Sequence, residues 1–194
     1  MNELKTIVEI NEEIKNIVYA AENISLTATN AMLVARQAGI NAVGFSVVAR
    51  ELRVFSEKMA TAMQELSKQI YRQVMVTASK RHRSHSVVLL TQAGSHGELA
   101  KTRIASACAR CHADIDEMEQ LIASMLRELQ ITMKRTAKQC STGLVIARSA
   151  GIEAAHGGAM TPVLRQIAQD VEDVVDNITV RVKKLESRLT EAGS

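Results

Sequence analysis

The chain has 194 residues, of which 24 are Lys or Arg and 21 are Asp or Glu, and its formal net charge at pH 7 is +3. This balance excludes the strongly basic surface that is typical of nucleic-acid-binding proteins. With one proline, nine glycines, two tyrosines, two phenylalanines and no tryptophan, the chain lacks the turn and strand formers of a β-sandwich or an α/β fold. We therefore expect an all-α protein.

The same sequence features bear on where the protein is found. No apolar run approaches the roughly 18 residues of a membrane span, and the first residues lack the basic-then-apolar layout of a secretory signal. The three cysteines are an odd number, and nothing marks an oxidising compartment. We expect a cytoplasmic protein that neither enters a membrane directly nor binds nucleic acid.

Two long helices are predicted in the first half of the chain, at about residues 3–38 and 43–90. Their apolar residues recur at alternating steps of three and four, close to the heptad period of a coiled-coil seam. Gly39 suits the position just after a helix C-terminus, where a left-handed backbone is common. The seam includes Ile10, Ile17, Ile24, Ala31 and Ala35 in the first helix, and Leu52, Met59, Leu66 and Ile70 in the second.

Two further helices are predicted in the second half, at about residues 98–150 and 161–189. The best turn signal before them is the run Ala-Gly-Ser-His-Gly at residues 93–97. Gly151 is expected to close the third helix. Thr161 as N-cap and Pro162 as first helical residue mark the start of the fourth.

Helices of about 36 residues are at least about 54 Å long, and short turns between them make neighbours antiparallel. The sequence therefore predicts an elongated antiparallel four-helix coiled-coil bundle, a single domain over residues 1–194, made of two repeated helical hairpins. The first hairpin covers residues 1–92 with its tip at 39–43. The second, degenerate hairpin covers residues 98–194 with its tip at 151–160.

The two hairpins are related by an internal repeat. The string Ala-Arg-x-Ala-Gly-Ile-x-Ala occurs at residues 35–42 and again at 147–154, an offset of 112 residues. The same offset pairs Leu52 with Leu164 and Leu66 with Ile178 without a gap. The duplicate could supply the second hairpin of a bundle within one chain, so both a monomeric pseudo-dimer and a homodimer remain open.

Residues 30–53 resemble the signalling tip of bacterial methyl-accepting chemotaxis receptors. The string Gly-Phe-x-Val-Val-Ala-x-Glu-x-Arg at residues 44–53 carries the resemblance, which extends over roughly residues 22–70. The positions that match the family pattern are Asn30, Ala31, Ala35, Ala38, Gly39, Gly44, Phe45, Val47, Val48, Ala49, Glu51 and Arg53.

The resemblance implies a cytoplasmic helical hairpin whose tip binds a histidine kinase and its coupling protein. Its residues here would be Asn30, Leu33, Val34, Gln37, Gly39, Ile40, Asn41, Val43, Gly44, Phe45, Val48, Glu51 and Arg53. Val34, Gln37, Ile40 and Val43 stand where the family has charged residues, so the tip is more apolar than usual. We expect a receptor-like interaction module of a chemotaxis array that contacts the kinase, the coupling protein or other receptor signalling domains.

The alternative is a cytoplasmic metal- or redox-sensing bundle. Cys108, Cys111 and His112 share one helix face, and a turn centred near residue 95 would place residues near 81 opposite Cys108. His82 and His85 would then complete a Cys/His set. Cysteine is also a common small core residue, so we expect no metal centre.

No Gly-rich phosphate loop, nucleophile elbow or paired-carboxylate pocket is visible in the sequence. We therefore expect a protein without enzyme activity and without a cofactor, which acts through contact.

Overall fold

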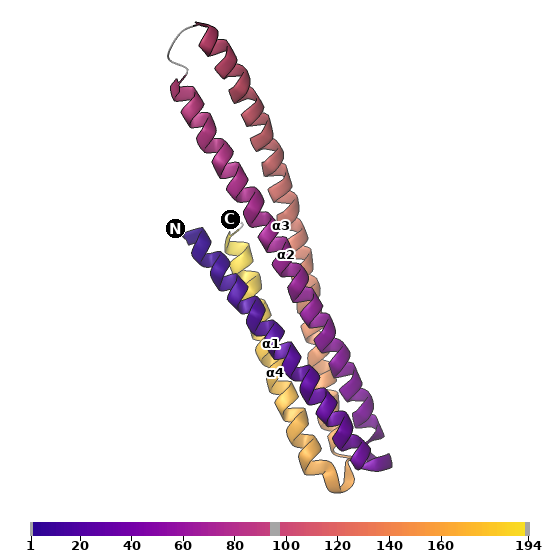
Figure 1. Ribbon diagram of the computed structural model, residues 1–194. Coiled ribbons are helices and arrows are strands. Elements are labelled where there is room, and N and C mark those ends of the chain that lie inside the picture. Colours follow the sequence, from indigo (N-terminus) through magenta and orange to yellow (C-terminus); the bar gives the residue numbers. More distant parts are fainter. Residues whose placement is uncertain (1, 94–97, 193–194) are drawn as a thin grey trace. The chain divides into compact units, whose positions relative to one another are not determined.

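The computed structural model describes residues 2–93 and 98–192, and within these ranges all regular structure is helical. Four long helices follow one another along the chain (Figure 1). The expectation of an all-α protein is confirmed. The elements are α1 (Asn2–Gln37), η1 (Gly39–Ala42), α2 (Val43–Ala93), α3 (Glu98–Ala154), η2 (Gly158–Met160) and α4 (Thr161–Ala192). Most of the predicted central turn, residues 94–97, lies outside the described residues.

The chain divides into two compact units. We call the first, Met1–Ser67 with Gln130–Ser194, the bundle unit, because it contains α1, α4 and the adjoining parts of α2 and α3. We call the second, Lys68–Leu129, the two-helix unit, because it contains only the remaining parts of α2 and α3. Each of the two predicted hairpins contributes residues to both units.

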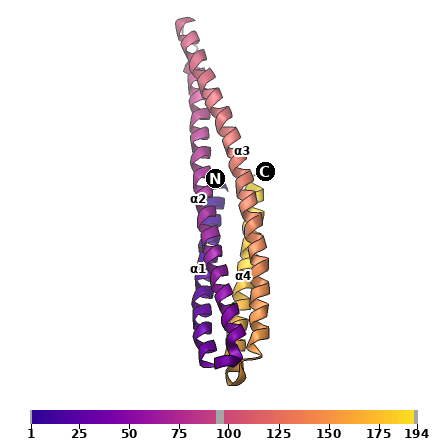
Figure 2. The ribbon, with the colours of Figure 1, turned by 90° about the vertical axis from the view of Figure 1, so that its right-hand side faces the viewer.

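The core of the bundle unit is an apolar stripe along each of its four helices. The four helices run side by side, with η1 and η2 at one end and the described ends of α1 and α4 at the other (Figures 1 and 2). Because residues three and four apart share a helix face, the predicted seams collect on the inner faces. Fully buried members are Ile17, Ile24, Ala31 and Ala35 on α1, Leu52, Met59, Met63 and Leu66 on α2, Met133, Cys140 and Ala147 on α3, and Leu164, Val171, Ile178 and Leu185 on α4.

Polar contacts add to this packing between α1 and its neighbours. The Glu13 carboxylate accepts hydrogen bonds from Arg181 Nη1 at 2.9 Å and Lys184 Nζ at 2.6 Å, which joins α1 to α4. The buried Ser56 hydroxyl donates to the carbonyl oxygen of Ala21, which joins α2 to α1. These bonds satisfy polar groups that would otherwise be costly to bury.

The turn between α1 and α2 forms as the sequence predicts. Gly39 adopts φ +71°, the left-handed region that favours glycine, and the 3-10 turn Gly39–Ala42 leads directly into α2. Apart from its two chain neighbours, no atom of the described residues lies within 4 Å of the place where a Gly39 Cβ would be, so backbone conformation alone accounts for glycine here.

Two predictions about the second turn are wrong. Gly151 does not close α3, because the helix continues to Ala154 and the left-handed residue is Gly158, at φ +58°. Thr161 is not a non-helical N-cap, since its backbone is helical at φ −46° and ψ −47°. The pair Gly157 and Gly158 supplies the flexible turn, so nothing requires the helix to stop at Gly151. Pro162 does lie in the first turn of α4, where a missing N–H costs nothing.

Within the residues described, none of the helices combines the length and apolar character needed to cross a membrane.

Candidate docking surface at the turns of the bundle unit

At the end of the bundle unit where the two turns lie, two apolar side chains pack in the core. Ala42, the last residue of the 3-10 turn, and Phe45, in the first turn of α2, are each 1% exposed. Phe45, which the resemblance assigns to the contact tip, is therefore not part of the exposed surface. Its ring packs in the core, because the buried residues of α2 recur at 45, 49 and 52 and place this face inward.

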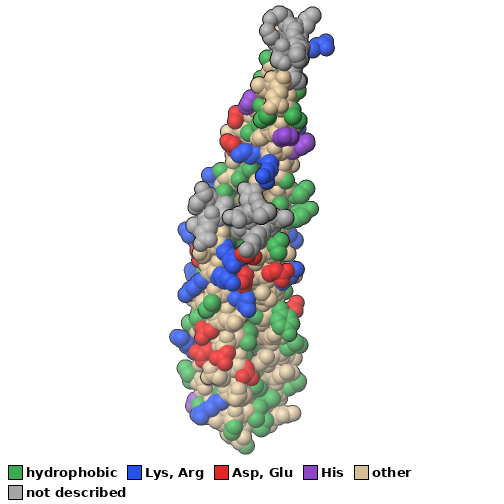
Figure 3. Space-filling model, turned by 90° about the vertical axis from the view of Figure 1, so that its left-hand side faces the viewer, with side chains coloured by type: hydrophobic (Ala, Val, Ile, Leu, Met, Phe, Trp, Pro, Cys, Tyr) green, Lys and Arg blue, Asp and Glu red, His purple; other side chains and the backbone are tan. Residues whose placement is uncertain are grey.

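The outer side of the same turn carries exposed apolar side chains. Ile40 is 88% exposed and Val43 is 58% exposed, and Leu33 on α1 and Val47 on α2 are also exposed. We call these four residues the apolar tip. Hydrophobic side chains are visible on the turn end of the bundle unit in the space-filling view (Figure 3). A group of exposed apolar residues at one end of a helical bundle is typical of a contact site.

Two residues of the second turn, Glu153 and Gly158, lie beside the first turn. Asn41 and Gly158 are neighbours, since a Cβ on Gly158 would lie 3.4 Å from Asn41 Nδ2. The Glu153 carboxylate occupies the space that a side chain at Gly44 would need. A carboxylate beside the first turn of α2 is favoured by the partial positive charge of a helix N-terminus.

Some residues of this surface were missed in the sequence. Val47 is exposed, whereas the predicted Val48 is only half-exposed. Ile152, the repeat counterpart of Ile40, is exposed on the other turn, and Glu153 follows it. The spacing of buried residues on α2 could have identified Val47, and the repeat could have identified Ile152.

The remaining predicted tip residues lie on α1, in the 3-10 turn and on α2, at varying exposure. Arg53 forms an exposed ion pair with Glu57, 3.4 Å between Nε and Oε1, one turn along α2. Such a pair contributes little to stability. Asn30, Gln37, Gly39, Asn41 and Glu51 are exposed, and Val34, Gly44 and Val48 are half-exposed.

The five candidate metal ligands belong to the two-helix unit. Cys108 and Cys111 are half-buried free thiols, and His82, His85 and His112 are exposed. Nδ1 of His112 lies 2.8 Å from the Cys108 carbonyl oxygen of its own helix. Among the described residues, which include all five, no group of three or more His, Cys, Asp or Glu side chains could hold a metal ion.

The expected pairing of Cys108 with residues near 81 is wrong. Arg83 Nη1 lies 3.1 Å from Asp114 Oδ2, and Lys80 Nζ lies 2.7 Å from Glu119 Oε1. Since Cys108 is six residues before Asp114 and the helices run in opposite directions here, it is level with α2 residues near 89. These two ion pairs show the register of the helices, which the turn signal alone did not predict.

Among the described side chains, two groups have clearly shifted pKa values, and both lie on helices of the bundle unit away from the turns. The hydrogen bond from Lys184, together with that from Arg181, lowers the pKa of Glu13 although burial opposes this. Burial raises the pKa of the Cys140 thiol to about 11. Both effects are explained by packing between helices.

In comparisons with known proteins, no family model and no curated protein matches this sequence.

Proposed function

We propose that this chain is a receptor-like interaction module that docks a chemotaxis histidine kinase, its coupling protein or a receptor signalling domain through the apolar tip. The observation that carries this proposal is the exposure of Ile40, a β-branched side chain that is 88% exposed at a turn. Burying such side chains against a partner contributes about 1.5–3 kcal/mol each before the costs of association. The resemblance of residues 30–53 to receptor tips supports the choice of partner.

The proposal includes a cytoplasmic location and a duplicated architecture, in which two antiparallel hairpins with coiled-coil packing form the bundle unit. Residues 112 positions apart have matching burial, which supports a duplication. Ala35 and Ala147, Ala42 and Ala154, Leu52 and Leu164, Met59 and Val171, and Leu66 and Ile178 are all at most 1% exposed. A shared heptad spacing contributes to this agreement, but the matching string around the two turns does not follow from spacing alone.

The absence of charged side chains at the tip favours a partner with an apolar contact surface. Ile40 and Val43 stand where receptor tips carry charged residues, and both are well exposed. A partner surface with an apolar groove and few charges would fit such a tip, since unpaired charges are costly to bury. The first turn would therefore dominate docking, and the polar residues around it, such as Gln37 and Asn41, would form the rim.

Binding measurements with purified kinase, coupling protein and receptor signalling domain test the proposal. We expect micromolar binding to at least one of them and a loss of at least about tenfold in affinity for Ile40→Arg. Leu26→Arg is the matched control, because Leu26 is exposed on α1 outside the tip. Neither variant should change the helix content.

Two results would contradict the proposal. One is the absence of binding to all three proteins at about 50 µM. The other is equal loss of binding in Ile40→Arg and Leu26→Arg, which would place the contact outside the apolar tip.

The metal-sensing alternative is not proposed. Cys108, Cys111 and His112 are not joined by His82 and His85 at the register of the two helices, and the residues described contain no ligand group of the required size.

A further inference from the structure

The α2 segment of the two-helix unit, residues 68–92, carries an exposed stripe whose members recur at steps of three and four and so share one face of the helix. We call this stripe the outer stripe, and its exposed members are Lys68, Tyr71, Met75, Ala78, His82, His85, Leu89 and Gln92. Gln73, Lys80 and Val87 lie on the opposite side of the helix and are half-buried. Since Lys80 pairs with Glu119, that opposite side faces α3 and the outer stripe faces away from it.

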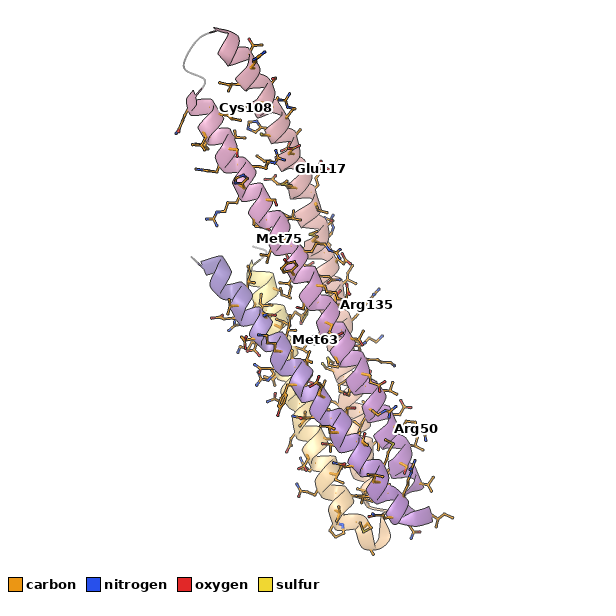
Figure 4. The ribbon with its side chains drawn as sticks, viewed as in Figure 1. Arg50, Met63, Met75, Cys108, Glu117 and Arg135 are labelled. Carbon is orange, nitrogen blue, oxygen red and sulfur yellow. The ribbon has the colours of Figure 1, made fainter. Side chains whose placement is uncertain are left out.

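Three large apolar side chains of the outer stripe are open to solvent. Tyr71 is 68% exposed, Leu89 is 53% exposed and Met75, which is labelled in Figure 4, is 52% exposed. On the described part of α3 in the same unit, the large apolar residue with comparable exposure is Leu121, at 43%. The exposed apolar groups of this unit are therefore concentrated on α2, and such a grouping is typical of a contact site.

The charges around the outer stripe are of one sign. Residues 68–92 contain five Lys or Arg residues and no Asp or Glu, whereas residues 43–67 of the same helix contain three Glu. Lys68 and Arg72 are exposed, and neither has an ionic partner among the residues described. Histidine side chains lie near Lys and Arg side chains on the two-helix unit in the space-filling view (Figure 3). The stripe therefore suits an anionic partner.

Apolar groups placed among cations favour one class of anionic partner. A membrane that contains anionic lipids offers negative headgroups to Lys and Arg and an apolar interior to side chains such as Met75 and Leu89. Tyrosine is favoured at the boundary between the two layers, which suits Tyr71. A nucleic acid would leave Met75 and Leu89 in water, and the stripe has a single aromatic ring on which bases could stack.

We propose that the outer stripe binds the surface of an anionic membrane, with residues 68–92 of α2 lying in the plane of the lipid headgroups. Lys68 and Arg72 contact the negative headgroups, while the three exposed apolar side chains reach the boundary with the acyl chains. The contact is peripheral and needs no segment that spans the membrane.

Co-sedimentation of the full-length chain with lipid vesicles tests the proposal. We expect binding to vesicles in which about one lipid in three is phosphatidylserine, and at least about tenfold weaker binding to vesicles of phosphatidylcholine alone. Binding should weaken as salt is added, because salt screens exposed charges. No binding to the phosphatidylserine vesicles at about 1 mM lipid would overturn the proposal.

Charge reversal separates a local contact from an effect of net charge. Lys68→Glu with Arg72→Glu should weaken vesicle binding at least about tenfold. Lys134→Glu with Lys138→Glu is the matched control, because these lysines are also exposed and four residues apart but lie on α3 of the bundle unit. The control should change binding by less than about threefold. Equal loss in both double variants would overturn the assignment to the outer stripe.

A fluorescent probe locates the contact without changing any charge. The chain has no tryptophan, so Tyr71→Trp introduces a single indole into the outer stripe. Its emission should shift to shorter wavelength when phosphatidylserine vesicles are added, because the ring leaves water for the membrane boundary. Tyr19→Trp is the matched control, since Tyr19 on α1 is 67% exposed, and its emission should not shift. A shift in both variants, or in neither, would contradict the proposal.

Apolar anchoring distinguishes a membrane from a nucleic acid. Met75→Ser with Leu89→Ser should weaken vesicle binding at least about fivefold, whereas Leu121→Ser on α3 should leave it unchanged. Tighter binding to a short DNA or RNA duplex than to the vesicles, unaffected by the two serine changes in α2, would identify a nucleic acid as the partner and overturn the proposal. Ile40→Arg should not weaken vesicle binding, which separates this test from that of the apolar tip.

Discussion

The ring of Phe55 on α2 packs directly against Gly143 on α3, so closely that a Cβ at residue 143 would lie 2.5 Å from Phe55 Cε2. The residues related to them by 112 positions are Ile167 and Ala31. In the first pair, the large side chain of Phe55 faces a glycine. At the related positions the sequence has a smaller side chain, Ile167, and a larger residue, Ala31. Compensation of this kind keeps packing density even while the two halves differ in sequence.

Adding a methyl group at residue 143 should destabilise the bundle unit. We expect Gly143→Ala to lower the free energy of unfolding by about 1–2 kcal/mol, because overpacking the buried Phe55 ring outweighs the better helix propensity of alanine. Phe55→Ile alone should lower it by a similar amount through the cavity it leaves. Combined, the two changes reproduce the Ile167 and Ala31 pair and should cost clearly less than their sum. Urea unfolding in a double-mutant cycle measures the coupling, and strict additivity would contradict it.

Two glycines at matching repeat positions should respond with opposite sign to the same substitution. Gly39→Ala should destabilise by about 1 kcal/mol, since alanine is strained at φ +71°. Gly151→Ala should stabilise by about 0.5–1 kcal/mol, because Gly151 lies within α3 and, outside its own stretch of helix, no atom of the described residues lies within 4 Å of an added Cβ. Thermal unfolding of both variants tests this prediction. A shift of the melting temperature in the same direction for both would be inconsistent with the backbone conformations of Gly39 and Gly151.

The carboxylate of Glu13 should make stability depend on pH. Its pKa is lowered in the folded chain by the hydrogen bonds from Lys184 and Arg181, so its contribution is present above the ordinary carboxyl pKa and is lost as pH falls through the lowered value. Glu13→Gln should cost about 1–2 kcal/mol at pH 7 and progressively less in acid.

Glu12→Gln is the matched control for this measurement. Glu12 pairs with Lys15 one turn along α1, and its side chain is 58% exposed, whereas that of Glu13 is 10% exposed. The change should stay within about 0.5 kcal/mol at every pH. If Glu13→Gln and Glu12→Gln changed the free energy of unfolding equally, burial between α1 and α4 would not strengthen the ion pairs of Glu13.

The three thiols should react at two different rates. Burial raises the pKa of Cys140 to about 11, so almost none of it is thiolate at neutral pH, and its side chain is also inaccessible. Cys108 and Cys111 are half-buried and should be modified first by a thiol reagent. Cys140→Ser should remove only the slow phase. Three equal rates in the folded chain would contradict the buried position of Cys140.

Much of the helical architecture could be predicted from the sequence. The spacing of Ile17, Ile24 and Ala31 on α1, and of Leu52 and Met59 on α2, identified buried faces because a helix returns to the same side every three to four residues. Gly39 was placed correctly as the left-handed residue, since α1 ends just before it, at Gln37, and the chain turns there.

The parts that failed depend on long-range packing. Gly151 occurs in the same string as Gly39, yet the helix continues past it because Gly157 and Gly158 provide the turn further on. Phe45 was assigned to the tip by resemblance, and its side chain is in the core. The position of Cys108 relative to α2 could not be derived from a turn signal, because the ion pair of Arg83 with Asp114 reflects a register that local sequence does not encode.

The two turns of the bundle unit belong to a single polypeptide, and this affects how the surface can evolve. In a symmetric assembly of identical chains, every substitution is copied to each turn. Here Ile40 and Ile152 can change independently, and so can Asn41 and the Gly158 beside it. One turn is therefore free to specialise for a ligand protein while the other maintains the end of the bundle, and each polypeptide would recruit one such protein and not two.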